Sequence, residues 1–300
     1  MTDALLLLPD FLLILVGYLV CRYTALSRPL WDSIERIVYH LLFPALLFIT
    51  IVRHPLQLDA ALPVAACGLA VVLAGVVMAY AARLLPGVDE RLHASGAQTA
   101  FRFNSYVALA LAERVAGPPG LAWTAILLAA CVPVCNLAAV WPLARHGGQS
   151  YGRELLRNPL ILATGAGLVF NLLGLSLPAI AANTLSRVGA AAVPLGLMAV
   201  GAGLQMGALN ASPRLAAIFL GIRHVLLPLF AVALVITIGL PQPQQALIVT
   251  FAALPTASSA YVLAVRMGGH GGFVAGLVTV STLIAMAGLP LALALLQWLS

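Results

Sequence analysis

The chain has no lysine and little charge of either sign. Only 8% of its 300 residues are charged, whereas water-soluble proteins carry roughly 25% charged residues, so the composition excludes an ordinary soluble domain. All fifteen basic residues are arginines, scattered singly without the basic stripe of nucleic-acid-binding proteins. We therefore expect no nucleic-acid partner and interpret the arginines as signals of membrane topology.

Residues that bind metals or perform covalent chemistry are also scarce. The four cysteines lie in apolar segments, and Cys131 and Cys135 share a helix face without a histidine or carboxylate to complete a metal site. We interpret all four as small buried side chains. Neither an HExxH nor a paired-aspartate motif occurs. The sequence therefore predicts no enzyme, no metal site and no bound cofactor.

Apolar residues make up 62% of the sequence, and the mean hydropathy is +1.06. A membrane-spanning helix needs about 20 predominantly apolar residues. Apolar runs between charged or Pro/Gly punctuation predict an all-α polytopic membrane protein embedded in the lipid bilayer. The ten predicted spans are 4–22, 33–52, 60–85, 95–115, 120–144, 155–177, 179–207, 214–240, 244–265 and 272–299.

Arginines are distributed unequally among the connections between these spans. The even-numbered connections hold Arg53 and Arg114. Since positive residues favour the cytoplasmic side, the richer odd-numbered connections are expected to be cytoplasmic. The sequence thus predicts a multi-pass protein of the cytoplasmic (inner) membrane with both termini outside. The arginines of the odd-numbered connections are Arg22, Arg28, Arg83, Arg91, Arg145, Arg153, Arg157, Arg214 and Arg266.

Prolines recur at half the chain length, which indicates an internal repeat. Each half contains five predicted spans, and because five is odd, the second half enters the membrane from the opposite side. We predict an inverted repeat of residues 1–148 and 149–300, a plan common among secondary transporters. The paired positions are Pro9 and Pro159, Pro44 and Pro194, Pro63 and Pro213, and Pro142 and Pro290, with glycines Gly17 and Gly167 each eight residues after the first pair.

Polar clusters interrupt the fourth and ninth predicted spans, which are counterparts in the repeat. The fourth contains FRFNSYVALA (101–110), and the ninth contains AALPTASSAYVLA (252–264). Pro255 removes a backbone donor in the ninth span. Backbone groups freed inside a membrane need partners, so such breaks are tolerated where they line a cavity or pack on protein. Both spans are therefore predicted to be broken helices that form a polar site near mid-membrane.

Five fragments in order resemble the auxin efflux carrier family of bacterial membrane proteins, relatives of the plant PIN carriers. The resemblance covers nearly the whole chain. The fragments are FLLILVGYLVCRYTALS (11–27) with FPALLF (43–48), RNPLILATGAGLV (157–169), AAVPLGLMAVGAGLQ (191–205), LPTASSAYVLAVRMGG (254–269) and VSTLIAMAGLPLAL (280–293).

This resemblance implies ten helices divided into a scaffold and a transport domain, with broken helices four and nine crossing near mid-membrane. It implies an organic anion, often a carboxylate, as cargo, and homodimers occur among the plant relatives. Asn104 matches the asparagine of the first crossover, and Pro255 the proline of the second. The family often has Gly-x-Pro after that asparagine, whereas this chain has Leu109 and Leu111. The first break must then depend on Asn104 and Ser105 competing for backbone hydrogen bonds.

Several of these polar residues have structural alternatives. Arg102 suits a carboxylate, or it pairs with an acid such as Glu113 or Asp10. Asp10 and His40 are candidates for proton coupling, or a helix cap and a packing residue respectively. For Arg223 and His224 we favour helix packing, with the guanidinium bonded to freed carbonyls. The substrate-binding candidates are Arg102, Asn104, Ser105, Tyr106, Pro255, Thr256, Ser258, Ser259 and Tyr261, of which the tyrosines are equally consistent with packing.

The sequence favours a secondary transporter for a small organic anion, a mono- or dicarboxylate, working by alternating access and coupled to a proton or sodium gradient or to neither. The cargo would bind at the crossing of the fourth and ninth helices. A cation or proton antiporter on a similar inverted fold is the alternative, although no aspartate lies in either broken span. An intramembrane enzyme is the less favoured third reading.

Overall fold

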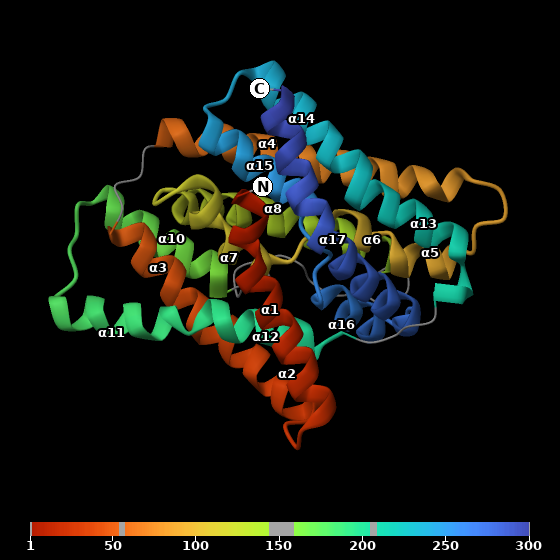
Figure 1. The fold of residues 1–300 in the computed structure, drawn as a ribbon, viewed down its shortest axis with the longest axis horizontal. Coiled ribbons are helices and arrows are strands. Elements are labelled where there is room, and N and C mark those ends of the chain that lie inside the picture. Colours follow the sequence, from red (N-terminus) through yellow and green to blue (C-terminus); the bar gives the residue numbers. More distant parts are fainter. Residues whose placement is uncertain (1, 54–57, 144–158, 205–208, 300) are drawn as a thin grey trace. The chain divides into compact units, whose positions relative to one another are not determined.

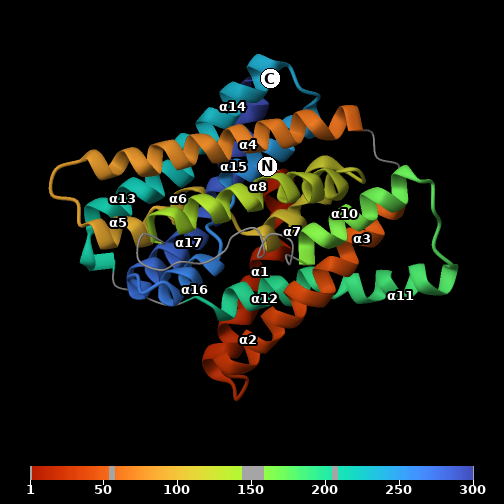
Figure 2. The same cartoon turned by 180° about the vertical axis from the view of Figure 1, so that it is seen from behind.

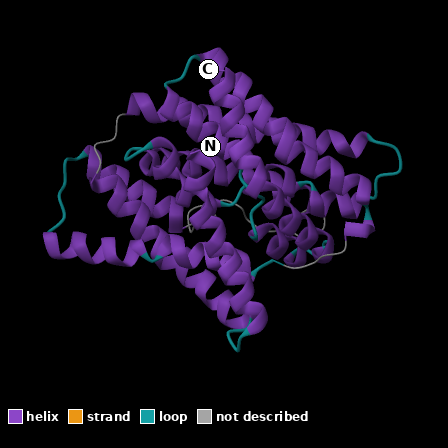
Figure 3. Ribbon diagram, viewed as in Figure 1, coloured by secondary structure: helices purple, strands orange, loops and turns teal. Residues whose placement is uncertain are grey.

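The computed structural model describes residues 2–53, 58–143, 159–204 and 209–299. Within these ranges the chain is helical, with short loops and one isolated β-bridge in place of any strand (Figures 1 and 3). The all-α prediction is therefore confirmed for the described part of the chain. Such an architecture satisfies backbone hydrogen bonds within each segment, as an apolar environment requires.

The described part of the first half, residues 2–53 and 58–143, contains eight α-helices, one π-helical turn and one 3₁₀-helical turn. They are α1 (Thr2–Tyr23), α2 (Arg28–Ile37), η1 (Val38–Leu42), α3 (Phe43–Arg53), α4 (Leu58–Ala81), η2 (Ala82–Leu84), α5 (Glu90–Gly96), α6 (Gln98–Phe101), α7 (Ser105–Ala116) and α8 (Gly120–Leu143). The described second half consists of α10 (Pro159–Leu172), α11 (Ala179–Ala190), α12 (Ala192–Ala202), η4 (Leu209–Ala211), α13 (Pro213–Gly221), η5 (Ile222–Leu226), α14 (Leu227–Ile238), α15 (Gln242–Ala253), α16 (Ser259–Arg266) and α17 (Gly271–Leu299).

Six helical segments among the described residues are long and apolar enough to cross a membrane. They correspond to six of the ten predicted spans. The predicted span 4–22 lies within α1, and 155–177 contains the shorter α10, while 95–115 and 244–265 are both interrupted. The six segments are Arg28–Arg53, Asp59–Leu84, Gly120–Ala139, Ala179–Ala202, Pro213–Ile238 and Gly271–Leu299.

The chain divides into two compact units, each of which takes segments from both halves of the sequence. Unit 1 comprises Met1–Pro63, Leu109–Ala129 and Ser150–Gly203, and unit 2 comprises Val64–Ala108, Ala130–Gln149 and Leu204–Ser300. The first interrupted span lies in unit 2 up to Ala108, and the second lies in unit 2 throughout. The candidate site described below therefore belongs to unit 2 alone.

In unit 1, glycines allow the backbones of paired helices to touch. A Cβ on Gly17 of α1 would overlap the Met198 carbonyl oxygen of α12, and a Cβ on Gly201 of α12 would overlap the Ile14 carbonyl oxygen of α1. Small residues permit close approach of this kind in membrane helices, where dispersion contacts replace the hydrophobic effect. Helices α1 and α12 are therefore held together by direct backbone contact.

A second helix pair in unit 1 also has a glycine at its interface, with a less close approach. A Cβ on Gly167 of α10 would lie 3.3 Å from the Phe48 carbonyl oxygen of α3, and the two helices lie side by side in both views (Figures 1 and 2). Gly167 is 150 positions after Gly17, and Phe48 is 150 positions before Met198. The two contacts therefore involve residues offset by 150 positions, with the glycine in the first half of the chain in one pair and in the second half in the other.

Two long helical segments widen into a π-helical turn before a proline. In η1 the Phe43 N–H bonds the Val38 carbonyl, and in η5 the Leu227 N–H bonds the Ile222 carbonyl. The following Pro44 has no N–H to continue an α-helical ladder, and the same holds for Pro228 after η5. A local π-turn accommodates such a missing donor. The π-turn η5 contains Arg223 and His224.

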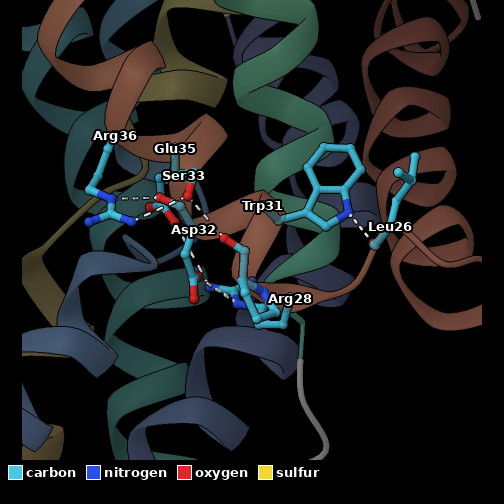
Figure 4. A network of polar contacts seen from close by, with 8 residues as sticks. Leu26, Arg28, Trp31, Asp32, Ser33, Glu35 and Arg36 are labelled. Carbon is cyan, nitrogen blue, oxygen red and sulfur yellow. Dashed lines mark hydrogen bonds and ion pairs between the residues drawn. The ribbon is translucent and has the colours of Figure 1, made fainter.

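Helix α2 carries a polar network in unit 1 (Figure 4). Arg28 Nε lies 2.9 Å from Asp32 Oδ1, and Arg28 Nη2 lies 3.9 Å from Glu35 Oε2. The buried Trp31 indole donates to the Leu26 carbonyl at 2.9 Å. These bonds tie the start of α2 to the preceding loop. The network lies far in sequence from the interrupted helices of unit 2 and contains none of the substrate-binding candidates.

The α1–α12 contact predicts the effect of a single methyl group. We expect Gly17→Ala to destabilise the protein by roughly 1–3 kcal/mol, because the new Cβ meets backbone that cannot rotate away. The measurement is the melting temperature of the purified protein in detergent. Gly165→Ala is the control, since a Cβ there meets nothing within 4 Å. Equal melting of the two variants would contradict the close contact.

Candidate substrate site at two helix breaks

The two interrupted spans leave helical geometry at their polar clusters. In the first, α6 ends at Phe101, Arg102 adopts an extended conformation (φ −75°, ψ 132°), and α7 begins at Ser105. In the second, α15 ends at Ala253, Leu254 is extended (φ −57°, ψ 149°), and α16 begins at Ser259. The residue before a proline disfavours helical geometry, which accounts for the position of the second break.

The two breaks meet through their backbones. Phe103 and Thr256 form an antiparallel bridge, and the Asn104 N–H donates to the Pro255 carbonyl at 2.9 Å. All four residues are buried. Backbone groups released from one helix thus find partners in the other, as burial away from water requires.

Asn104 caps the helix that follows the first break. Its Oδ1 accepts from the Tyr106 N–H at 3.0 Å and from the Val107 N–H at 3.3 Å. These are the second and third amides of α7, the usual partners of an N-cap side chain. The expected competition of Asn104 for backbone hydrogen bonds is therefore confirmed, and it operates without the Gly-x-Pro of the family pattern.

The other end of the same amide has no partner. Asn104 is 3% exposed, and among the described residues its Nδ2 makes no hydrogen bond. The orientation of the amide follows from chemistry, because the atom that accepts from two N–H groups must be the oxygen. An unsatisfied buried N–H donor costs about 1–3 kcal/mol. Such a group is a natural anchor for a bound acceptor.

Arg102 joins the first break to the start of α16. Its Nη1 donates to Gln98 Oε1 at 3.2 Å, and its Nη2 donates to Ser259 Oγ at 3.0 Å. Gln98 in turn donates from Nε2 to the Ala260 carbonyl at 3.2 Å. Two side chains from the first broken helix therefore reach the first turn of α16. Gln98 was not among the sequence candidates, although a glutamine four residues before Arg102 was a usable signal.

Thr256 ties the second break to neighbouring helices. Its N–H donates to Ser281 Oγ of α17 at 2.9 Å, and its hydroxyl donates to the Thr99 carbonyl of α6 at 2.6 Å. Ser281 Oγ also lies 2.8 Å from His224 Nε2. Ser281 and Thr99 are fully or almost fully buried. No sequence pattern pointed to Ser281, because a lone serine in an apolar helix resembles any packing residue.

Arg223 reaches the end of α15, as the packing interpretation predicts. Its Nε donates to the Leu254 carbonyl at 2.7 Å, and its Nη2 donates to the Phe251 carbonyl at 3.3 Å. The side chain is 1% exposed. The guanidinium is thus bonded to carbonyls freed by the break, and that interpretation is confirmed.

The remaining substrate-binding candidates lie beside the breaks with weaker constraints. Ser105 and Tyr106 are half-buried in the first turn of α7. Ser258 is the N-cap residue of α16, and its side chain makes no capping hydrogen bond. Tyr261 packs against the buried cluster of Ala260, Ala264, Val274 and Val278. That contact is what helix packing of Tyr261 requires.

Asp10 and His40 belong to unit 1. Asp10 is buried inside α1 and lies 3.2 Å from Arg114 Nη2. The helix-cap interpretation of Asp10 is therefore wrong, because the residue sits in a helix interior. His40 lies in η1 with Nδ1 2.9 Å from the Arg36 carbonyl of its own helix. Neither residue is near a cluster of metal-ligating side chains within the described ranges.

The sequence between α8 and α10 contains a pattern typical of serine hydrolases. GQSYG at 148–152 fits the Gly-x-Ser-x-Gly pattern of nucleophilic serines. The pattern carries chemistry when it joins a strand to a helix, and the described ranges contain no strand. Residues 148–152 themselves lie outside the described residues.

The cap on α7 predicts a difference between two substitutions of one residue. Asn104→Ala removes the acceptor, and we expect it to destabilise the protein by about 1 kcal/mol. Asn104→Ser keeps an oxygen at the cap and should lose less. Melting temperatures in detergent provide the measurement. The control is Asn183→Ala, which removes an exposed hydrogen bond from Arg53 but no helix cap. Equal losses for the alanine and serine variants would show that capping is not what Asn104 contributes.

Comparison with known proteins agrees with the resemblance of the sequence. A family model described as "Membrane transport protein" matches residues 143–293, slightly more than half of the chain. This range includes the second break, η5 and α17 up to residue 293. A search of curated proteins gives no match. The chain therefore belongs to the membrane transport protein family, the auxin efflux carrier family that its sequence resembles.

Proposed function

We propose that the protein is a secondary transporter that carries a small organic anion, a carboxylate, across the cytoplasmic membrane by alternating access. The observation that carries the proposal is the meeting of two broken helices at Phe103 and Thr256, with the Arg102 guanidinium on the start of α16. Discontinuous helices of this kind form the substrate sites of many secondary transporters. The cargo binds at the two breaks in unit 2.

The positive ends of two helices favour an anion at this place. Helix N-termini present unpaired N–H groups and a partial positive charge. The N-terminus of α7 is already occupied by the Asn104 oxygen. The N-terminus of α16 has no side-chain cap, since Ser258 makes no capping bond. The Ala260 and Tyr261 N–H groups donate to the Ala257 and Ser258 carbonyls, so the partial positive charge of the helix end is what an anion would meet. We therefore place the carboxylate at the start of α16.

Two side chains from the first break complete this proposed site. Arg102 Nη2 already holds the Ser259 hydroxyl at the start of α16, and a planar guanidinium suits a carboxylate. Asn104 Nδ2 supplies a buried donor that lacks a partner among the described residues. Ser105, Tyr106, Thr256 and Tyr261 shape the surroundings of the cargo in this proposal, with Pro255 keeping the second break open.

The predicted inverted repeat is part of the proposal. It is supported by the exchange of Gly17 and Met198 for Gly167 and Phe48 in the two glycine contacts of unit 1. The breaks fit the same relation, since α7 and α16 begin at Ser105 and Ser259, about half a chain apart. In this arrangement ten spans form two inverted sets of five, with unit 1 as the scaffold and unit 2 as the transport domain.

A thermal-shift screen of the purified protein tests the function. The panel contains monocarboxylates, dicarboxylates, aromatic acids, amino acids and simple cations, each with and without sodium. A ligand at 100 times its dissociation constant stabilises the folded protein by about 2.7 kcal/mol. We expect a carboxylate to raise the melting temperature of the wild-type protein.

Variants of the two donors locate the bound anion. Arg102→Gln and Asn104→Ser should weaken carboxylate binding by about tenfold or more, since each removes a hydrogen bond to a charged group. Arg187→Gln is the matched control, because Arg187 is exposed in the last turn of α11 in unit 1. A response to sodium or pH but to no anion would overturn the carboxylate proposal in favour of a cation or proton antiporter. In that case Asp10→Asn tests whether Asp10 carries the pH response.

A further inference from the structure

The second break leaves specific carbonyl groups without their helical donors. Pro255 stands where a helix would supply an N–H to the Phe251 carbonyl, four residues earlier, and proline has none. That carbonyl keeps only a long bond of 3.4 Å from the Leu254 N–H. Arg223 donates to Phe251 at 3.3 Å and to the Leu254 carbonyl at 2.7 Å. One guanidinium therefore supplies donors to both carbonyls at the end of α15.

The charge of Arg223 is balanced by a helix end rather than by an acid. Within the described residues its guanidinium forms no salt bridge with a carboxylate, and the side chain is 1% exposed. The C-terminus of a helix carries a partial negative charge that favours a cation. Burying a guanidinium in a membrane protein is costly. The burial of Arg223 against the Phe251 and Leu254 carbonyls therefore indicates that the position of the end of α15 has to be fixed.

A chain of hydrogen bonds with a fixed direction holds the other side of the break. The Thr256 hydroxyl must give its proton to the Thr99 carbonyl, because a carbonyl has none to give. Ser281 Oγ therefore donates to Thr256 Oγ1, at 3.1 Å. His224 Nε2 must then be the donor in its 2.8 Å contact with Ser281 Oγ. The chain runs from His224 through Ser281 and Thr256 to α6 of the first broken helix.

The π-turn η5 explains how adjacent residues reach one break. A π-helical turn widens the helix and changes the direction of its side chains. Arg223 bonds α15 before the break, and His224 reaches Thr256 within it through Ser281. The turn itself follows from Pro228. The turn before Pro228 thus directs Arg223 and His224 to the break at Pro255.

We propose that Arg223 and His224, with Ser281, are positioning residues that hold the second break in register with the first. They fix the position of the Pro255 carbonyl, which accepts from the backbone N–H of Asn104. They also fix the backbone N–H of Thr256, which donates to Ser281 Oγ. The inference rests on the proposed function only in that the breaks bind cargo. The hydrogen-bond locking itself is measured without any ligand, so its failure and the failure of the transport proposal are separate results.

Hydrogen–deuterium exchange of the intact protein in lipid nanodiscs is the test. The amides to follow are those of Asn104 and Thr256, which bond the Pro255 carbonyl and Ser281 Oγ. Ser281→Ala removes the acceptor of Thr256, and we expect exchange at both amides to rise by roughly fivefold or more. Thr282→Val is the matched control, because the neighbouring hydroxyl bonds only the Val278 carbonyl of its own helix.

Conservative pairs separate positioning from general stability. His224→Gln keeps an N–H donor and should retain wild-type exchange at Thr256, whereas His224→Leu should raise it severalfold. Arg223→Met should raise exchange at Asn104, and Arg223→Lys should rescue it only in part, because an ammonium lacks the two-pronged geometry. Arg91→Met is the control arginine, since Arg91 is exposed and bonds the Gly268 carbonyl beyond the end of α16.

Two results would overturn the proposal. One is unchanged exchange at Asn104 and Thr256 in the Ser281→Ala protein. The other is equal exchange in His224→Gln and His224→Leu, which would show that the donor of His224 is irrelevant. If Arg223→Met does not fold, the serine and histidine variants still decide the question. A locked break in a protein that binds no carboxylate would support the positioning role and contradict the cargo assignment.

Discussion

The hydrogen bond from the backbone N–H of Asn104 to the Pro255 carbonyl is what allows two helices to break in the same apolar unit. A break releases backbone donors and acceptors, and no water is available in a bilayer to satisfy them. Here each break supplies partners for the other, through this bond and the Phe103–Thr256 bridge. Either break alone would leave buried backbone groups without hydrogen-bond partners, which explains why both breaks occur in one unit.

Side chains elsewhere in unit 2 form hydrogen bonds with the other backbone groups freed by the two breaks. Asn104 Oδ1 accepts from the second and third N–H groups of α7, and Ser281 Oγ accepts from the Thr256 N–H. Arg223 donates to the Phe251 and Leu254 carbonyls at and just beyond the end of α15. Cys135 adds a weak thiol donor to the Phe101 carbonyl at the end of α6, at 3.6 Å. Different side chains thus do at the two breaks what helical hydrogen bonds do elsewhere. The start of α16 is left without a side-chain cap, which is why the proposed anion is placed there.

Unit 1 meets a different constraint with different residues. Most of its helices are apolar, and α1 packs on α12, and α10 on α3, through apolar surfaces with small residues. Gly17 and Gly201 let α1 and α12 touch backbone to backbone, and Gly167 brings α10 close to the Ile51 side chain and the Phe48 carbonyl of α3. The buried charge of Asp10 is matched by Arg114. Close glycine contacts and the Asp10–Arg114 ion pair thus hold helices of this unit together.

The sequence alone determined the features that depend on neighbours along the chain. Low charge and long apolar runs indicated a membrane protein, Pro255 marked one break, and Asn104 marked the other despite leucines at 109 and 111. The spacing of prolines and glycines indicated which segments correspond. These signals are local, because helix formation, capping and interruption involve residues within a few positions of each other. The family match then agreed with the resemblance that those residues carry.

Only the tertiary structure decided which polar side chains meet. The sequence left Arg102 free to pair with Asp10 or Glu113, yet it bonds Gln98 and Ser259, while Asp10 pairs with Arg114. Ser281 showed no pattern at all, although it links Thr256 to a histidine 57 residues away in the chain. Such partners are fixed by how helices pack, and packing joins residues that no short-range periodicity connects.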